Sequence, residues 1–416
     1  MKKLWFILLA GVLLSPLCAA QDKVLAFYQR AAAAKGKTIK QDRAFASVLA
    51  QDMAQWVRAY PDNPEVKTAL LLQAGYHQRA QQLPQALVAL YQVRFYFPAS
   101  QDVAVLSTQT ENIMDELNRA QKAQALKLLA TDTTRLEGLQ ARRAALLTHL
   151  VQADLKYIYA PVVGLFEDFF TQYPDYEAMD KMTLLYGDWH RQNDNFLAAI
   201  TAYKKVYELY PSTVYKAAAM RMMADVYAFG LTDYDTATAL YNQVLKEYPN
   251  SAEIGVVYKH LAVVSENQKQ YDNALHYYDK AIAQLGAQPA AFEAWQGKAD
   301  VLGKTKDYQA QYNTLLQGSE FFTADESKYI SLLEQAAKVA QKRLKRPSLQ
   351  AAALDKILVA YPQTHRAPEF LYEAALANEK QGKTAQALQL YKQIVIHHPT
   401  DKYAGRAQSR LNKLEK

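Results

Sequence analysis

Aromatic–proline pairs recur at a nearly constant spacing along this 416-residue chain. The series consists of Tyr60-Pro61, Phe97-Pro98, Tyr173-Pro174, Tyr210-Pro211, Tyr248-Pro249 and Tyr361-Pro362, and His398-Pro399 continues it. The interval from Pro61 to Pro98 is repeated from Pro174 to Pro211 and from Pro362 to Pro399, and the step from Pro211 to Pro249 exceeds it by a single position. The longer gaps, Pro98 to Pro174 and Pro249 to Pro362, correspond to two and three such intervals. A fixed period of this size is typical of chains built from stacked helical repeats.

Apolar residues precede each proline at fixed distances. Eight residues before the prolines stand Met53, Leu90, Phe166, Tyr203, Tyr241, Leu354 and Tyr391. Five residues before them stand Trp56, Val93, Phe169, Val206, Val244, Ile357 and Ile394. Steps of three and four residues place these side chains on one face of an α-helix. Proline then ends the helix, because it lacks an N–H group and disfavours the α conformation of the residue before it.

A second helix is expected before each of these helices. Small residues stand 24 positions before Pro98, Pro211 and Pro399, and they are Ala74, Gly187 and Ala375. A small side chain lets two helices approach each other closely, and a short polar segment separates the two helices. One unit has Gly286 where the others have proline. Glycine can also end a helix, because it adopts the left-handed conformation without strain.

These markers resemble the tetratricopeptide repeat family, whose 34-residue unit is a helix–turn–helix with small, aromatic and proline positions. The match is good in Met182–Pro211, Ala219–Pro249, Tyr258–Gly286 and Leu371–Pro399, and fair in Leu70–Pro98. The units here are longer than those of the family. The resemblance implies an all-α fold, a right-handed α-solenoid of about ten helix–turn–helix units with a C-terminal capping helix.

The strength of the markers divides the chain into segments. We expect a signal peptide at 1–20, N-terminal repeats at 21–100, degenerate helical repeats at 101–160, well-matched repeats at 161–289, a second degenerate segment at 290–346, C-terminal repeats at 347–399 and a capping helix at 400–416. The two degenerate segments keep the spacing but lose most markers. They are either distorted repeats or lengthened helices.

The residues just after the prolines follow a shared scheme. Hydroxyl side chains stand there in Ser212-Thr213 and Asn250-Ser251. Such a side chain can accept a hydrogen bond from the N–H groups at the start of the next helix. The scheme resembles periplasmic repeat proteins of Gram-negative envelopes, such as the Tol-associated division coordinator and the outer-membrane assembly lipoproteins. This resemblance implies a class of envelope protein and does not identify a partner.

The first twenty residues have the pattern of a secretory signal. Two lysines follow Met1, an apolar run extends from Leu4 to Leu14, and small residues lead to Ala20. We expect cleavage after Ala20 and a periplasmic protein; the alternative is a lipid anchor on Cys18, although the residues before it fit the lipoprotein pattern poorly. Cleavage removes the single cysteine and two lysines, so the formal charge falls from +7 to +5. We expect no transmembrane helix in the mature chain and no binding of nucleic acid.

Motifs of known catalytic and metal chemistry are absent from the sequence, and we expect no enzyme activity, no metal and no cofactor. Gly297 and Gly303 precede Lys304-Thr305, but five residues separate the glycines where a phosphate loop has four, so no nucleotide is expected. Glu326-Ser327 is similar to the Glu-Ser of lytic transglycosylases, but the segment that forms their sugar cleft is missing. We interpret Asp325-Glu326 as the acidic first turn of a helix.

The aromatic residues are interpreted mainly as core. The repeated Tyr203, Tyr241, Tyr278 and Tyr391 lie in the packing stripe, whereas Tyr157, Tyr159, Tyr176 and Tyr312 lie outside its register. Exposed tyrosines outside the register would be needed for a carbohydrate-binding surface. His190 is next to the small-residue position and is interpreted as an interior histidine.

The predicted binding surface is one face of the first helix in each pair, which lines the concave groove of repeat solenoids. The candidate partner-binding residues are Lys181, Asp188, Arg191, Arg221, Asp225, Lys259, Glu266, Glu369 and Tyr372. Both signs of charge alternate among them, which favours a polypeptide over a polyanion.

We therefore expect an exported scaffold that binds peptides of cell-envelope partner proteins without catalysis. The alternative is a component of a secretion or polysaccharide-export machine, and a peptidoglycan-processing enzyme is a remote one. The sequence leaves the partner and the oligomeric state open.

Overall fold

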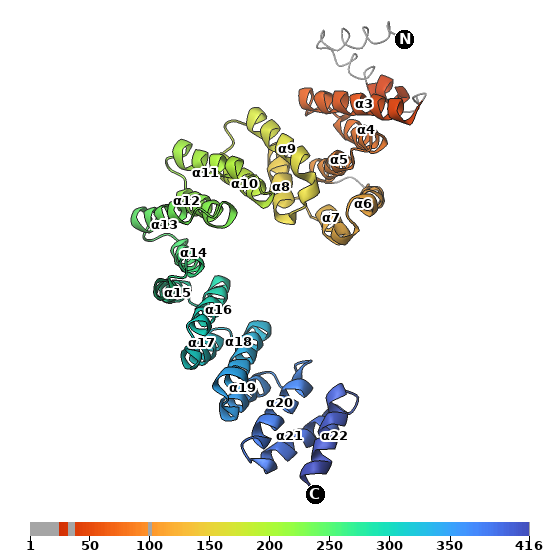
Figure 1. The fold of residues 1–416 in the computed structure, drawn as a ribbon. Helices are drawn as coiled ribbons and strands as arrows, with labels where there is room; N and C mark the ends of the chain where they lie inside the picture. Colours follow the sequence, from red (N-terminus) through yellow and green to blue (C-terminus); the bar gives the residue numbers. More distant parts are fainter. Residues whose placement is uncertain (1–24, 32–37, 99–101, 416) are drawn as a thin grey trace. The chain divides into compact units, whose positions relative to one another are not determined.

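The computed structural model describes residues 25–31, 38–98 and 102–415, and it divides the chain into two compact units, Met1–Tyr215 and Lys216–Lys416. Within the described ranges every regular element is helical and no strand occurs, which confirms the all-α prediction (Figure 1). The predicted signal peptide at 1–20 and the alternative lipid anchor at Cys18 lie outside the described residues.

The first unit contains helices of uneven length. They are α3 (Ile39–Ala59), α4 (Val66–Arg79), α5 (Leu83–Tyr96), α6 (Val103–Leu117), η1 (Arg119–Gln121), α7 (Lys122–Leu129), α8 (Gly138–Ala153), η2 (Lys156–Ile158), α9 (Tyr159–Gln172), α10 (Met179–Gln192) and α11 (Phe196–Leu209). Residues 25–31 are also helical. The pairs α4–α5 and α10–α11 pack side by side, as in a helical repeat, and α3 packs against α4.

The second unit is more regular. Its elements are α12 (Lys216–Asp225), η3 (Val226–Gly230), α13 (Tyr234–Glu247), α14 (Ile254–Asn267), α15 (Tyr271–Leu285), α16 (Pro289–Lys304), α17 (Tyr308–Glu320), α18 (Glu326–Val339), η4 (Ala340–Leu344), α19 (Pro347–Ala360), α20 (Ala367–Glu379), α21 (Thr384–His397) and α22 (Lys402–Leu414). Each helix packs against its neighbour in the chain. Helix α22 ends the stack with a mostly polar outer face, as the predicted capping helix requires.

The aromatic residue before each proline ends its helix, as predicted. The capping residues Tyr60, Phe97, Tyr173, Tyr210, Tyr248, Tyr361 and His398 have ψ angles between 51° and 79°, outside the α region. The following proline excludes the α conformation at that position. After the proline, Ser251 Oγ accepts a hydrogen bond from Glu253 N at 3.2 Å, and Asp401 Oδ1 accepts one from Tyr403 N at 2.8 Å.

The turn inside a helix pair contains one residue in the left-handed conformation. These residues are Gln81, Asp194, Thr232, Lys269, Lys306, Lys345 and Gly382. In the turn at Lys269, the next backbone N–H, that of Gln270, donates to the carbonyl of Ser265 at 2.8 Å. This hydrogen bond satisfies a free carbonyl at the end of the first helix. The sequence did not reveal this position, because only one of the seven residues is glycine.

Two first helices end in a π-helical turn. In η3 the backbone N–H of Leu231 donates to the carbonyl of Val226, five residues earlier, at 2.9 Å. The wider turn accommodates one additional residue. This insertion explains why the step from Pro211 to Pro249 is one position longer than the step from Pro174 to Pro211. It also places Asp225, rather than the small residue Ala224, 24 positions before Pro249.

Helix α5 is the centre of the first unit. All its residues from Ala86 to Tyr96 are buried, and α4, α6, α7, α8 and α9 contact it. A helix that is apolar on all sides requires such complete cover. Arg94 of α5 donates to the carbonyls of Leu129 and Thr131, at 2.7 Å each, and so caps the end of the short helix α7. The helices of residues 102–160 thus pack around α5, and α7, with 8 residues, is the one short α-helix among them.

The second degenerate segment, 290–346, differs from the first. Helices α16, α17 and α18 have ordinary lengths and pack consecutively. The glycines that precede Lys304-Thr305 serve this packing: a Cβ atom at Gly303 would lie 2.8 Å from Gln311 Nε2, and one at Gly297 would overlap the ring of Tyr278. The segment is therefore helical repeat structure without a phosphate loop.

Candidate functional site

A tyrosine of the second helix donates a hydrogen bond to a carboxylate of the first helix in four pairs. The pairs are Tyr203 with Asp188 at 2.8 Å, Tyr241 with Asp225 at 2.7 Å, Tyr278 with Glu266 at 2.8 Å and Tyr391 with Glu379 at 2.7 Å. The rings of these tyrosines are buried, as their place in the stripe predicts. Burial and then the nearby carboxylate raise the pKa of Tyr241 far above its usual value, so this hydroxyl stays a donor.

The carboxylate occupies one of two neighbouring places on the first helix. Asp188 follows directly after the small residue Gly187, whereas Glu266 stands four residues after the small residue Ala262. Positions three residues apart lie on the same helix face. A Cβ atom at Gly187 would lie 2.5 Å from Tyr203 Cε1, which confirms that the small residue lets the tyrosine ring pass close to the first helix.

Ion pairs connect successive first helices of the second unit. Those that join residues of successive repeats are Arg221–Glu253 at 2.5 Å, His260–Asp225 at 2.6 Å, Lys259–Glu293 at 2.5 Å, Lys304–Glu266 at 2.6 Å, Arg366–Glu334 at 2.8 Å and Arg410–Glu379 at 3.3 Å. We call this set the ion ladder. It supplies the tyrosine-bound carboxylates with partners from the next repeat, which are His260 for Asp225, Lys304 for Glu266 and Arg410 for Glu379.

Asp225 has the densest set of partners in the ion ladder. Its Oδ1 accepts hydrogen bonds from Tyr241 and His260, and its Oδ2 pairs with Arg221. Burial by itself raises the pKa of Asp225, but the hydrogen bond and charge of His260 and the charge of Arg221 outweigh burial and hold the pKa below its usual value. The carboxylate is therefore ionised and fully satisfied at neutral pH.

The structure places most of the nine predicted groove residues in this internal network. Asp188, Arg191, Arg221, Asp225, Lys259, Glu266 and Glu369 each have a charged partner within 3.3 Å. The ring of Tyr372 packs between those of Tyr391 and Tyr403. Lys181 alone among the nine is fully exposed. Their role in partner binding stays a prediction.

The sequence-based prediction missed the partners of these residues. The ladder partners of Arg221, Asp225, Lys259 and Glu266 are outside the nine candidates, and they are Glu253, His260, Glu293 and Lys304. The signal was present in the sequence, because the two opposite charges of each ladder pair stand about one repeat apart.

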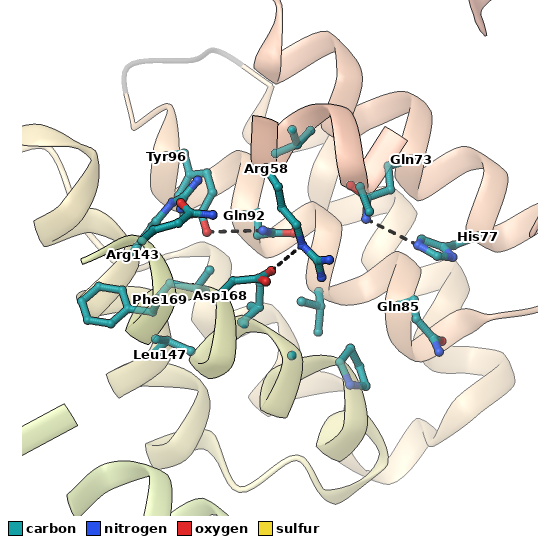
Figure 2. A pocket seen from close by; sticks show the side chains of 18 residues that line it. Arg58, Gln73, His77, Gln85, Gln92, Tyr96, Arg143, Leu147, Asp168 and Phe169 are labelled. Atoms are coloured by element: carbon teal, nitrogen blue, oxygen red, sulfur yellow. Dashed lines mark hydrogen bonds and ion pairs between the residues drawn. The ribbon is translucent and has the colours of Figure 1, made fainter. Parts of the chain in front are cut away.

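A cleft of about 210 Å³ lies in the first unit, between α3, α4 and α5 on one side and α8 and α9 on the other. Figure 2 shows Arg58 of α3 and Asp168 of α9 reaching toward each other, with Nε and Oδ2 2.7 Å apart. These residues are 110 positions apart in the sequence. The cleft exists because segment 101–160 packs around α5, and no sequence motif indicated it.

The tyrosines outside the stripe are engaged in the structure. Tyr312 is buried and donates to the carbonyl of Leu349 at 3.0 Å. Tyr159 is half-buried, and its hydroxyl lies 2.7 Å from Nδ1 of the buried His190, which confirms His190 as an interior residue. The half-buried Tyr157 donates to Met114 Sδ at 3.2 Å. This arrangement disfavours a carbohydrate-binding surface at these positions.

The acidic pair at 325–326 begins a helix, as interpreted from the sequence. Asp325 is the N-cap of α18, where it accepts the N–H of Lys328 at 3.1 Å, and the exposed Glu326 lies in the first turn. Elsewhere in the described ranges, no group of three His, Cys, Asp or Glu residues could hold a metal ion. Among those residues too, no helix is both long and apolar enough to span a bilayer.

The repeated tyrosine–carboxylate hydrogen bond gives a first prediction. Tyr278→Phe is expected to lower the free energy of unfolding by about 1–2 kcal/mol, because a hydrogen bond to a charged acceptor is lost and the partly buried Glu266 loses one donor. Urea unfolding measures this change. The control is Tyr277→Phe, because the Tyr277 hydroxyl makes no hydrogen bond to the residues that the structure describes. Equal effects of both substitutions would contradict the prediction.

Comparisons with known proteins identify the repeats. The tetratricopeptide repeat family model matches residues 218–251 and 369–401, which contain most of α12 to α13 and of α20 to α21. The comparison with curated proteins found no match.

Several solved structures are similar at low identity. A crystal structure of the APC/C hetero-tetramer Cut9–Hcn1 has 12% identity and a TM-score of 0.33, covering 95% of this chain and 86% of that one. The C-terminal part of a tetratricopeptide repeat protein from Cytophaga hutchinsonii has 14% identity and a TM-score of 0.43, covering 64% and 98%. A tetratricopeptide repeat protein from Parabacteroides merdae has 13% identity and a TM-score of 0.33, covering 67% and 98%.

The chain thus contains tetratricopeptide repeats within an all-helical fold. This repeat fold suggests a protein–protein interaction scaffold, and it implies protein partners. The narrower resemblance to envelope repeat proteins stays a prediction.

Proposed function

We propose that this protein is an exported, non-catalytic scaffold of the bacterial cell envelope that binds partner polypeptides along the first helices of its pairs. The observation that carries the proposal is the ion ladder on tetratricopeptide repeats. Because its charges are already paired within the fold, this face is ordered before a partner arrives, and binding loses less conformational entropy. Mixed charge favours a polypeptide that offers both signs.

A partner is expected to contact the exposed charged side chains in and beside the ion ladder. The side chains of the ladder residues Glu293 and Lys304 are 65% and 51% exposed. The side chain of Lys338, which pairs with the ladder residue Glu334 within α18, is 57% exposed. The second helices of the same unit offer a matched comparison, since Glu320 and Lys356 are 56% and 46% exposed and pair with each other. The two sets differ in the helix that carries them and not in charge or exposure.

Site-specific photocrosslinking tests the proposed face. We expect p-benzoylphenylalanine at Glu293, Lys304 or Lys338 to crosslink the full-length protein in living cells to the same partner, and the probe at Glu320 or Lys356 to give no such product. Equal crosslinking from both sets would contradict binding along the first helices. Crosslinks only to glycan or to subunits of an export machine would favour the alternative, a component of a secretion or polysaccharide-export machine.

The export step is tested independently by the N-terminus of the purified protein. Intact-mass spectrometry is expected to find a chain that starts at Gln21 and fractionates with the periplasm. A chain that is acylated at Cys18 and found in the membrane fraction would favour the alternative, a lipid-anchored protein. A full-length chain starting at Met1 in the cytoplasm would overturn the envelope proposal.

A further inference from the structure

The cleft of the first unit contains a buried cation that no acid in the described ranges neutralises. Arg143 of α8 is only 7% exposed. Its Nη1 donates to the amide oxygen of Gln172, and its guanidinium lies 5.3 Å from the ring centre of Tyr96 and 5.6 Å from that of Tyr173. Its Nε is buried and has no hydrogen-bond partner among the residues that the structure describes. An unsatisfied charged donor in the interior is costly, which calls for a further partner.

The other charged groups of the cleft do not supply that partner. Asp168 is the only carboxylate among the lining residues, and its Oδ2 pairs with Arg58. Burial lowers the pKa of His77, although its hydrogen bond with Gln82 opposes this, so the imidazole is neutral at pH 7. Two guanidinium groups and one carboxylate leave the cleft with a net positive charge.

The neutral lining suits a planar anion. Gln73, Gln85 and Gln92 extend from α4 and α5 into the lining, and Figure 2 shows Gln92 beside Tyr96 and Arg143. Amide N–H groups can donate to an anion without adding charge. Apolar side chains such as Leu147 and Phe169 complete the wall and lower the local dielectric constant, which strengthens a charge-assisted hydrogen bond. The volume of about 210 Å³ admits a short side chain or a small acid.

We propose that this cleft binds a carboxylate group and that Arg143 is its counter-ion. The carboxylate belongs to a small organic acid, to an acidic side chain or to the C-terminus of a polypeptide, since all three present the same two oxygens. The cleft lies outside both segments that match the tetratricopeptide repeat family. It is also in the unit that the crosslinking experiment on the ion ladder does not probe, so either proposal can fail without the other.

Binding to the wild-type protein is the first test. The full-length mature chain is titrated with glutarate, with N-acetylglutamate amide, and with acetyl-trialanine as the free acid or the amide. The NMR signal of the Arg143 Nε–H, assigned by its loss in Arg143→Lys, is expected to shift downfield with at least one carboxylate and not with the trialanine amide. The probe that shifts it identifies the source of the carboxylate. No shift with any acid at millimolar concentration would overturn the proposal.

Charge variants of opposite sign give the second test, measured by calorimetry with the probe that binds. Arg143→Gln is expected to weaken binding about tenfold or more, because the charge-assisted hydrogen bonds are lost. Asp168→Asn removes the only acid of the cleft and is expected to tighten binding about threefold. A role in folding alone would not give opposite signs.

The matched control is the neighbouring residue of the same helix. Arg142 donates to the backbone carbonyls of Leu136 and Tyr96 and does not line the cleft. Arg142→Gln changes the net charge as Arg143→Gln does, and it is expected to leave binding unchanged. Equal weakening by both arginine variants, or weakening by Asp168→Asn, would overturn the assignment of Arg143.

Discussion

Asp225→Asn is expected to destabilise the second unit by about 3 kcal/mol at pH 7, the lower end of the range for breaking a buried ion pair. The carboxylate serves Tyr241, His260 and Arg221 together, so its loss leaves Arg221 with only Glu253 and removes the acceptor of His260. The value lies at the lower end because Glu253 still compensates Arg221. Hydrogen exchange of peptides from α12 to α14 in increasing urea measures the change in this region.

The pH dependence of this difference provides a second readout. The pKa of Asp225 in the folded chain lies below its usual value of 3.8, so the ionised group stabilises the fold above that pH. This contribution is lost as the pH falls through the lower pKa of the folded state. The stability difference between wild type and Asp225→Asn is therefore expected to shrink as the pH falls below about pH 4.

The control for Asp225→Asn is Asp272→Asn. Asp272 is exposed in the first turn of α15, where its charge is favourably placed for the helix dipole. The control is expected to change stability by less than about 1 kcal/mol. Similar losses for the two variants, or a difference that persists unchanged to pH 2.5, would show that the network around Asp225 does not hold this part of the fold together.

The helix ends and the packing stripe were predictable from the sequence because each depends only on residues of one helix and on the proline that follows it. Proline excludes the α conformation of the aromatic residue before it, whatever surrounds the pair. The buried Tyr203, Tyr241, Tyr278 and Tyr391 follow from steps that return to one helix face. Such local rules need no knowledge of the neighbouring repeats.

Two kinds of feature were not predictable from the sequence. Some depend on contacts between repeats, and others depend on a backbone conformation that no residue type indicates. The left-handed residue is Thr232 in one turn, Lys269 in another and Gly382 in a third, so no residue type indicates this position. The π-helical turn η3 changes the register by one residue, which looks like ordinary variation of the spacing. The central position of α5 depends on how segment 101–160 folds back, and the cleft at Arg143 depends on it in turn.

The candidate groove residues illustrate the same limit. Their place on the first helices was predictable, but their partners were not, because Lys259 and Glu266 pair with residues of the next repeat. A charged residue on a helix face looks solvated until its neighbour one repeat away is considered. The ion ladder therefore gives these residues a structural role, and its exposed members Glu293 and Lys304 leave their side chains accessible to a partner.

Gly297→Ala is expected to destabilise the second unit by about 1–2 kcal/mol, the balance of overpacking and helix propensity. A Cβ atom at this position would overlap Cζ and Oη of Tyr278 and lie 2.7 Å from its Cε1. The ring cannot turn away easily, because it is buried and its hydroxyl is bonded to Glu266. Overpacking of this kind costs about 1–3 kcal/mol. The higher helix propensity of alanine offsets up to about 1 kcal/mol of this destabilisation.

Gly405→Ala is the matched control, because Gly405 lies within α22 and a Cβ atom there would meet no atom within 4 Å. It is expected to stabilise the protein by up to about 1 kcal/mol, so the two substitutions have opposite signs in urea unfolding. Combining Gly297→Ala with Tyr278→Phe should cost less than the sum of the single changes, since the phenylalanine ring lacks the overlapping hydroxyl. Stabilisation by Gly297→Ala, or strict additivity with Tyr278→Phe, would show that the close approach of α16 to Tyr278 does not constrain this position.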